Sequence, residues 1–441
     1  MHTNQSKENF LKLSSSQVAL EAPSQEQIKL SVMDNTVSEG ITVHFYFCYD
    51  NPNQDVNFME PEAMRESLSK LLGDYPWIGG ALTVDDGGKY TINLNGYGVQ
   101  FDIVRVDAPL NQFKFGSSDE FQKENLCSHW TGLSPCQIQL TYFVCGGVVL
   151  SAEFDHRLLD GESAVVFLQN WSKVHHGKPF TKPTFDRSHL QPSPSVDPNI
   201  QFPGHTAKLE HSYQESLKTR PPTVSDTIVF TSHELENMKK SAQDPSEYQV
   251  PWVSTNDALC AHMWRVVSRA RGLGREESTI VIQANNLRKK MIPTKVFVGN
   301  MVYTPFTDPI TVGELLSSPL SRSAAIVRRS INSVTEERIQ NWIDYVSVVP
   351  RPQSLAYDKS FYGSNIIVSS LVSFDLYAVS FGRSPFNAGE VPALWEGLFR
   401  MYACKKKGDV EIRICLVREH MNKLLSDPEL HKYRNVEIQN V

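Results

Sequence analysis

His156 and Asp160 are the two residues whose types and spacing best suit proton-transfer chemistry. The histidine follows a long apolar run, and the carboxylate comes four positions later, directly before Gly161. An imidazole with an ordinary pKa of about 6.5 can remove a proton at neutral pH, and a neighbouring carboxylate can orient it or balance its charge. The same spacing also fits a histidine that ends a strand and a carboxylate that begins a helix. Spacing alone leaves both interpretations open.

The residues around this pair predict two strands, a tight turn and a helix. Residues 137–145 and 148–154 are rich in β-branched, aromatic and other apolar side chains, and a pair of glycines separates them. This pattern is typical of a β-hairpin. After Gly161 the apolar side chains recur at helical spacing as far as Trp171. The pair therefore falls on the connection between a buried strand and a helix.

Alternating strand and helix patterns over the rest of the chain predict an α/β protein. Apolar and β-branched runs predict strands at residues 41–49, 81–105 (a hairpin around 85–88), 226–231, 279–284, 366–372 and 410–416. Helices are predicted at residues 61–72 and after two capping sequences, Thr231–Glu234 and Ser254–Asp257.

The length of the chain, 441 residues, predicts two domains rather than one ordinary core. A proline-rich passage with few periodic apolar positions lies between the two regular regions and indicates a crossover. The predicted division is therefore an N-terminal domain at 1–185, a crossover linker at 186–224 and a C-terminal domain at 225–441.

Composition and charge argue against several classes of protein. A formal net charge of −6 disfavours a nucleic-acid binder, which normally carries a basic face. The first residues lack the basic start and apolar run of a secretory signal, and no stretch has the roughly 20 apolar residues of a membrane span. Seven cysteines without a CxxC pair favour reduced thiols over a disulfide framework or a zinc site. A cytoplasmic protein without a metal is expected.

Several motifs, in the same order along the chain, resemble those of the BAHD acyl-CoA-dependent acyltransferases. The HxxxDG sequence that begins at His156 follows a strand of a CGG-containing hairpin, as in that family. Further matches are Leu30-Ser31 with Asp34 (LSxxD), Tyr75-Pro76 with Gly79 (YPxxGR), residues 254–265 (SxxDALxAHxWR), Asn286-Leu287-Arg288 (the arginine strand), residues 297–300 (YFGN) and residues 410–421 (the last strand and EHM helix). The resemblance spans about residues 30 to 425.

The resemblance implies a role for each of four residues. His156 would remove a proton from an acceptor hydroxyl or amine as that atom attacks the thioester carbonyl of acyl-CoA, without an acyl-enzyme. Asp160 would be structural and pair with Arg288 behind the catalytic loop; a surface arginine beside two lysines is the alternative for Arg288. Ser369 would donate a hydrogen bond to the tetrahedral oxyanion, although an ordinary strand serine fits the sequence equally.

Candidates for contacts with CoA come from two regions. Ser254 and Thr255 stand at a predicted helix start, where N–H groups and hydroxyls could meet phosphate or pantetheine, and where a plain N-cap is the alternative. Lys289, Lys290 and Arg383 could meet the CoA phosphates.

Departures from the family pattern concern the substrate pockets rather than the reaction. The sequence SFGRS at 380–384 stands where plant members carry DFGWG and keeps only the central Phe-Gly. Gly80 stands where arginine is usual in YPxxGR, and Leu371 stands where plant members use a tryptophan against the acceptor. The altered DFGWG segment suggests a fungal-like member, distant from the plant enzymes, and Leu371 suggests a different acceptor pocket.

The implied fold is two chloramphenicol-acetyltransferase-like α/β domains, each a mixed sheet flanked by helices, with a solvent channel between them that reaches His156. The implied function is transfer of an acetyl or hydroxycinnamoyl group from acyl-CoA to a small-molecule alcohol or amine of specialised metabolism, by a monomer. One rival is a carrier-protein-dependent condensation-type domain, which usually has two adjacent histidines where this chain has Asp155 and His156. The other rival is a non-catalytic CoA-binding protein of the same fold.

Overall fold

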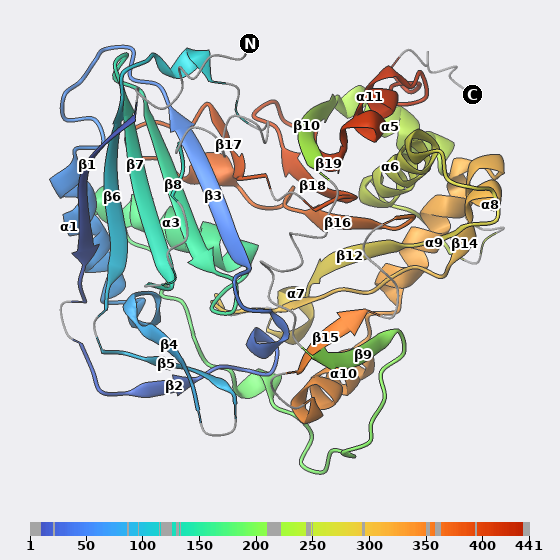
Figure 1. Ribbon diagram of the computed structural model, residues 1–441, viewed down its shortest axis with the longest axis horizontal. Helices are drawn as coiled ribbons and strands as arrows, with labels where there is room; N and C mark the ends of the chain where they lie inside the picture. The colour runs from blue at the N-terminus through green and yellow to red at the C-terminus, as the bar shows by residue number, and fades with distance from the viewer. Residues whose placement is uncertain are drawn as a thin grey trace.

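The computed structural model shows two six-stranded sheets side by side, each flanked by helices (Figure 1). The residues that the structure describes are 10–20, 23–85, 88–95, 97–113, 115, 126–128, 132, 134–209, 222–243, 248, 250–292, 296–349, 353–357, 363–392 and 395–434. Most of the predicted N-terminal arm, at 1–9, and the centre of the predicted turn, at 86–87, lie outside these ranges.

The first sheet carries the predicted hairpin and ends at the catalytic candidate. Its order is β1 (Phe10–Val18), β6 (Val99–Val106), β7 (Cys136–Phe143), β8 (Val148–Asp155), β3 (Thr42–Tyr49) and β17 (Asn387–Glu390). Every residue of β8 is buried, which explains its nearly continuous apolar sequence. Gly146 adopts φ +81° in the turn between β7 and β8, a conformation that favours glycine. The hairpin therefore forms as predicted and delivers the chain to His156.

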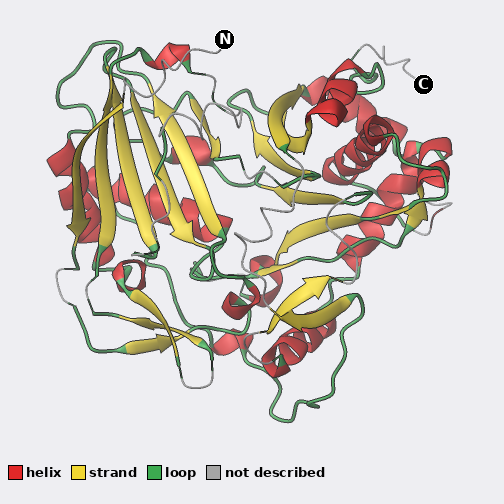
Figure 2. Cartoon of the chain, viewed as in Figure 1, coloured by secondary structure: helices red, strands yellow, loops and turns green. Residues whose placement is uncertain are grey.

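Two amphipathic helices cover one face of the first sheet (Figure 2). They are α1 (Pro61–Leu72) and α3 (Gly161–His175), and they pack against each other. The side chain of Asp160 accepts a hydrogen bond from the backbone N–H of Ser163 and so caps α3 at its N-terminus. Trp171 is fully buried beneath the sheet. The cap fixes where the helix begins, and thereby the length of the loop that holds His156.

The second sheet is mixed, and three of its strands run parallel. Its order is β10 (Thr223–Phe230), β19 (Val410–Val417), β18 (Leu398–Ala403), β16 (Ile366–Ser370), β12 (Val281–Asn286) and β13 (Val302–Tyr303). β16 lies between β12 and β18 and is parallel to both. Helices pack on this sheet and on one another, namely α5 (Ser232–Ser241), α6 (Thr255–Arg271), α9 (Leu320–Asn332) and α11 (Arg418–Ser426). The predicted capping box is present at Thr231 with Glu234, and the predicted cap at Ser254 also forms a capping box, with Asp257.

Smaller elements fill the space around the two sheets. A three-stranded sheet contains β2 (Gln27–Lys29), β5 (Tyr90–Asn93) and β4 (Ala81–Val84), so the predicted hairpin at 81–105 is present in its first part. Two-stranded pairs join β11 (Ser278–Thr279) to β14 (Ile310–Thr311), and β9 (His205–Leu209) to β15 (Gln353–Tyr357). Within the described ranges, the other α-helices are α7 (Arg288–Met291), α8 (Val312–Ser317) and α10 (Glu336–Val348).

The two halves of the chain are interlocked. Strand β17 belongs to the C-terminal half in sequence but pairs with β3 in the first sheet, from Asn387 opposite Cys48 to Glu390 opposite Phe45. The predicted crossover at 186–224 contributes β9, which pairs with a strand of the C-terminal half. The division at 1–185, 186–224 and 225–441 stays a prediction, and β17 crosses it.

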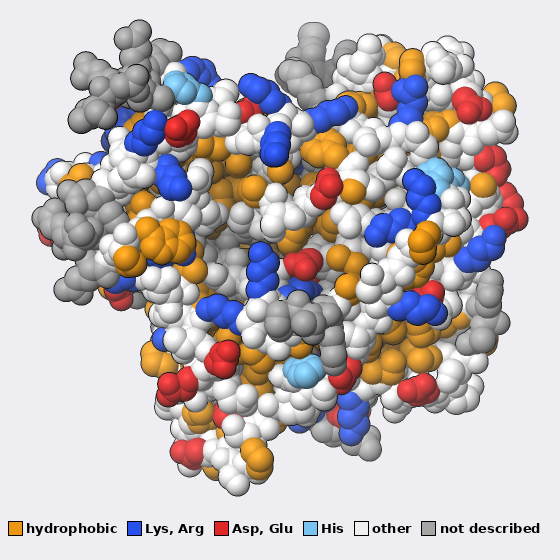
Figure 3. All heavy atoms as spheres, turned by 180° about the vertical axis from the view of Figure 1, so that it is seen from behind, with side chains coloured by type: hydrophobic (Ala, Val, Ile, Leu, Met, Phe, Trp, Pro, Cys, Tyr) orange, Lys and Arg blue, Asp and Glu red, His pale blue; other side chains and the backbone are white. Residues whose placement is uncertain are grey.

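Two mixed sheets flanked by helices confirm the predicted α/β class with two domains. Across the described ranges, none of the helices combines the length and the apolar character needed to cross a bilayer. Seen from behind, basic, acidic and hydrophobic side chains are interspersed around a hollowed central region (Figure 3).

Candidate active site

A cavity of about 410 Å³ lies where the two halves of the molecule meet. The first sheet contributes the start of β3, with Thr42 and His44, and the loop after β8, with His156. The second sheet contributes the carboxyl ends of β12 and β16, with Asn286 and Ser369. Ligands of open α/β sheets commonly bind beyond the carboxyl ends of parallel strands. The topology therefore places the histidine and the strand ends around one space.

His156 lines this cavity with its ring held at one nitrogen. Its backbone N–H donates to the carbonyl of Ile41 at 3.0 Å, and ring Nδ1 lies 3.1 Å from Oδ1 of Asn300. The other atom of the same amide, Nδ2, donates to the carbonyl of His156 at 2.8 Å, which fixes the orientation of the amide. Nδ1 must then carry the proton of the neutral ring, because it faces an acceptor. Nε2 is left unprotonated, as a general base requires.

The ion pair between Asp160 and Arg288 is present and bidentate. Nη1 of Arg288 lies 2.8 Å from Oδ2 of Asp160, and Nη2 lies 2.9 Å from Oδ1. Burial would raise the pKa of Asp160, but the charge and hydrogen bonds of Arg288 hold that pKa below its usual value. The carboxylate also accepts from the backbone N–H groups of Ser163 and Met301 and makes no hydrogen bond to His156. Asp160 thus fastens the loop to the C-terminal half, as its predicted structural role requires.

Arg288 itself lies just beyond the element expected for it. The expected arginine strand, β12, ends at Asn286, and Arg288 is the first residue of the short helix α7. Oδ1 of Asn286 accepts a hydrogen bond from the backbone N–H of Arg288 at 3.0 Å, which turns the chain at this point. The side chain is buried, so the alternative of a surface arginine is wrong.

Ser369 occupies β16 and lines the same cavity as His156. Ser369 is half-buried. Within the described part of the chain its hydroxyl has no hydrogen-bond partner, so the hydroxyl is free to donate to a group bound in the cavity. Leu371, the first residue after the strand, is buried beside it and forms part of the apolar wall. The position of Ser369 is compatible with the predicted oxyanion donor, and the position of Leu371 with an altered acceptor wall. The role of Ser369 stays a prediction.

None of the candidates for CoA contacts is among the described residues that line the cavity. Ser254 is the N-cap of α6: its hydroxyl accepts from the N–H of Asp257 at 3.2 Å, and Thr255 is the first residue of the helix. Lys289 is exposed, and Lys290 hydrogen-bonds to the carbonyl of Val334. Their contacts with CoA stay predictions.

The altered loop at 380–384 packs against α3. Phe381 is buried, and its ring centroid lies 5.0 Å from that of Trp171 in an edge-on arrangement. Gly382 adopts φ +89°, so the retained Phe-Gly pair has both a packing and a backbone reason. Nη1 of Arg383 lies 3.3 Å from a carboxylate oxygen of Asp50. The loop therefore fastens the C-terminal half to the first domain, while any contact of Arg383 with CoA stays a prediction.

Other functional residues had no predicted role. Asn300 lies within the YFGN-like sequence, and only its contact with His156 reveals a function for it. The cavity wall also contains Phe374, Trp395 and the ion pair of Arg400 with Glu390, in which Nε and Oε2 lie 2.9 Å apart. These positions come from four different segments, so no local sequence pattern could have grouped them.

Comparisons with known proteins agree with this geometry. A model of the Transferase family matches residues 14–431. Hydroxycinnamoyltransferase 1 of Oryza sativa is 29% identical over 83% of this chain and 86% of its own length. An Avena sativa hydroxycinnamoyl-CoA:5-hydroxyanthranilate N-hydroxycinnamoyltransferase, HHT4, is 28% identical over 87% of this chain and 90% of its own.

A solved structure shows the same fold at lower identity. TRI101 of F. sporotrichioides, complexed with coenzyme A and T-2, superposes with a TM-score of 0.80 at 21% identity, over 92% of this chain and 98% of its own. The family match includes every described residue that lines the cavity. The chain belongs to the Transferase family, that of the BAHD acyltransferases, and is an acyl-CoA-dependent acyltransferase.

Proposed function

We propose that this protein transfers a hydroxycinnamoyl or similar acyl group from acyl-CoA to a hydroxyl or amine of a small-molecule acceptor, with His156 as the general base. The observation that carries the proposal is the fixed ring of His156. Nδ1 faces an acceptor 3.1 Å away, and the ring lines a cavity of about 410 Å³ that both halves enclose.

The reaction proceeds in two proton-balanced steps. Nε2 of His156 takes the proton of the acceptor as its oxygen or nitrogen attacks the thioester carbonyl, and the negative charge moves onto the carbonyl oxygen. The hydroxyl of Ser369 donates a hydrogen bond to this oxyanion. When the intermediate collapses, the carbon–sulfur bond breaks, and the CoA thiolate receives the proton that His156 holds. No covalent bond to the protein forms.

Relatives support hydroxycinnamoyl groups as the acyl donors to test first. Both plant relatives described above are named hydroxycinnamoyltransferases, and one is named for transfer to the nitrogen of 5-hydroxyanthranilate. A Nicotiana tabacum relative, 27% identical over 91% of this chain and 95% of its own, is named for O-transfer to shikimate. Alcohols and amines therefore both belong in the acceptor panel.

A panel of acyl-CoA donors against acceptors tests the proposal, with release of free CoA thiol as the readout. p-Coumaroyl-, caffeoyl- and acetyl-CoA are each combined with shikimate, 5-hydroxyanthranilate, a long-chain alcohol and a diamine. We expect turnover without any carrier protein, and the product identified by mass. Binding of CoA without thiol release in every combination would support the non-catalytic alternative, and turnover only with a carrier-bound acyl group would support the condensation-type alternative.

A further inference from the structure

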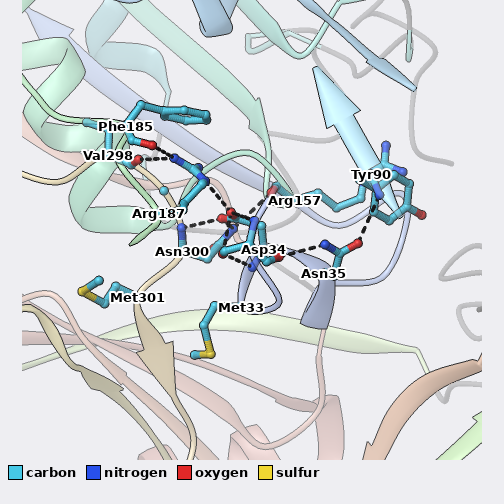
Figure 4. Close-up of polar contacts among 12 residues, drawn as sticks. Met33, Asp34, Asn35, Tyr90, Arg157, Phe185, Arg187, Val298, Asn300 and Met301 are labelled. Atoms are coloured by element: carbon cyan, nitrogen blue, oxygen red, sulfur yellow. Dashed lines mark hydrogen bonds and ion pairs between the residues drawn. The ribbon is translucent and has the colours of Figure 1, made fainter. Parts of the chain in front are cut away.

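Asp34 is a buried carboxylate that accepts hydrogen bonds from three separate parts of the chain (Figure 4). It follows β2 by five residues and is 0% exposed. Oδ2 accepts from the N–H of Ser31 at 2.9 Å, from its hydroxyl at 2.7 Å and from Nε of Arg187 at 2.8 Å. Oδ1 accepts from Asn300, from its backbone N–H at 2.8 Å and from Nδ2 at 3.1 Å. The proton-transfer scheme above gives this carboxylate no part.

Arg187 keeps the charge of Asp34 balanced from the predicted crossover. Its Nη1 donates to the carbonyl of Phe185 at 2.8 Å, and its guanidinium lies 3.2 Å from the centre of the Phe185 ring. That ring is stacked in turn on Trp77, with centroids 4.4 Å apart. A buried carboxylate needs a paired cation, and this arginine is itself held by Phe185 and by the carbonyl of Val298, which accepts from Nη1 at 3.3 Å. Asp34 therefore presents a fixed, charged acceptor to Asn300.

Asn300 connects this acceptor to the ring of His156. One amide N–H points to the carbonyl of His156 and the other to Asp34, so Oδ1 must face Nδ1 of the ring. If the amide turned over, Nδ2 would face Nδ1 and the neutral ring would move its proton to Nε2. An imidazole protonated at Nε2 cannot take a proton from the acceptor at that atom. The orientation of one amide thus decides which nitrogen is the base.

We propose that Asp34 is a positioning residue that acts through Asn300 to keep the proton of His156 on Nδ1 and so leave Nε2 free as the base. This inference rests on the proposed function of His156. Arg187 and Ser31 hold the carboxylate, and the carboxylate holds the amide. These hydrogen bonds join the N-terminal segment, the crossover and the C-terminal half, so His156 carries its proton on Nδ1 only when all three are assembled.

The test compares Asp34→Asn and Asn300→Ala with the double variant. We expect Asp34→Asn to lower kcat about 10- to 100-fold with little change in KM for acyl-CoA, a part of the 10²–10⁴-fold that base catalysis supplies. Residues that act through one another are not additive, so the double variant should lose little more than the more damaging single variant. Losses that multiply would overturn the proposal.

A second readout observes the tautomer directly. Long-range ¹H–¹⁵N spectra of the protein labelled with [¹⁵N]histidine, with His156→Gln to identify the signals, report which ring nitrogen carries the proton. We expect Nδ1–H in the natural protein and a shift toward Nε2–H in Asp34→Asn. The same tautomer in both proteins would overturn the proposal, even if kcat fell.

Glu234→Gln is the matched control for loss of a buried carboxylate. Glu234 is 0% exposed and pairs with Nε of Arg434 at 3.2 Å, at the cap of α5 and away from the cavity. The Glu234→Gln substitution should lower the melting temperature, while kcat and the His156 tautomer stay unchanged. If His156→Gln itself kept full activity, the proposed function would fail separately, whatever the behaviour of Asp34→Asn.

Discussion

Two histidines of this protein, His156 and His262, have contrasting surroundings. His156 directly follows a buried strand, has its Nδ1 beside Asn300 and lines the cavity between the two halves. His262 lies inside α6, is 2% exposed and has its Nε2 2.9 Å from the carbonyl of Leu430. Burial lowers the pKa of His262 to about 4, so this ring stays neutral across the physiological range. Of these two histidines, His156 is the one that lines the cavity.

A histidine within a recognisable sequence motif is therefore not by itself a catalytic candidate. Both residues belong to segments that resemble family motifs, yet the ring of His262 packs edge-on against Phe230 and Tyr433. In both residues one ring nitrogen lies within hydrogen-bond distance of an oxygen, but His156 also lines the cavity. Exchanging each residue should therefore damage different properties.

We expect His156→Ala to lose nearly all of its turnover. Because general-base catalysis contributes about 10²–10⁴-fold, kcat should fall by at least 100-fold while the melting temperature stays near that of the natural protein. Thiol-release kinetics and a thermal melt measure the two quantities. His262→Gln should show the reverse pattern, and equal losses of kcat in the two variants would remove the distinction between the residues.

Asp160→Asn should damage the frame around His156 rather than the proton transfer. It leaves Arg288 buried without its bidentate partner, a change that in other proteins costs about 3–5 kcal/mol of folding free energy. The pKa of Asp160 is lowered on folding, so its contribution is present at neutral pH and is lost as pH falls through the acidic range. Urea unfolding at several pH values measures this, and an unchanged unfolding midpoint at pH 7 would contradict the structural role.

Some features of the fold and the site could be predicted from the sequence, and others could not. The hairpin, the caps at Thr231 and Ser254 and the Asp160–Arg288 pair could all be predicted, because local patterns or the family resemblance specify them. The placement of β17 in the first sheet could not, because a four-residue strand gives almost no periodic signal. Asn300 and Asp34 were visible as motif residues without a role, since their roles depend on contacts over 144 and 266 positions of the chain.

Ser369→Ala separates stabilisation of the transition state from binding at the cavity. Removal of one oxyanion donor costs about 2.7–4 kcal/mol in other enzymes, so kcat should fall while KM for acyl-CoA stays nearly constant. Ser370→Ala is the matched control, because Ser370 is the next residue of β16 and lines the same cavity. A change confined to KM would place Ser369 among the binding residues instead.

His262 should make the stability of the folded protein modestly sensitive to acid. The unfolded chain binds a proton at this residue below pH 6.5, whereas the folded protein does not until about pH 4, so stability declines as pH falls through this window. The decline should reach about 2 kcal/mol by pH 5 and be absent above pH 7. Comparison of unfolding free energies at pH 5 and pH 7 for the natural protein and His262→Gln checks this, and an identical pH dependence in both would refute it.

Strand β17 has a consequence for any attempt to divide the enzyme. A fragment that stops in the crossover would keep His156 but expose the whole edge of β3, a ready template for aggregation. The last residue of the strand that seals this edge, Glu390, itself lines the cavity, so docking of the strand also sets the cavity wall. Two co-expressed pieces would have to re-form this short seam, together with the Asp160–Arg288 and His156–Asn300 contacts, to regain activity, which makes β17 a natural place to install a split-enzyme reporter.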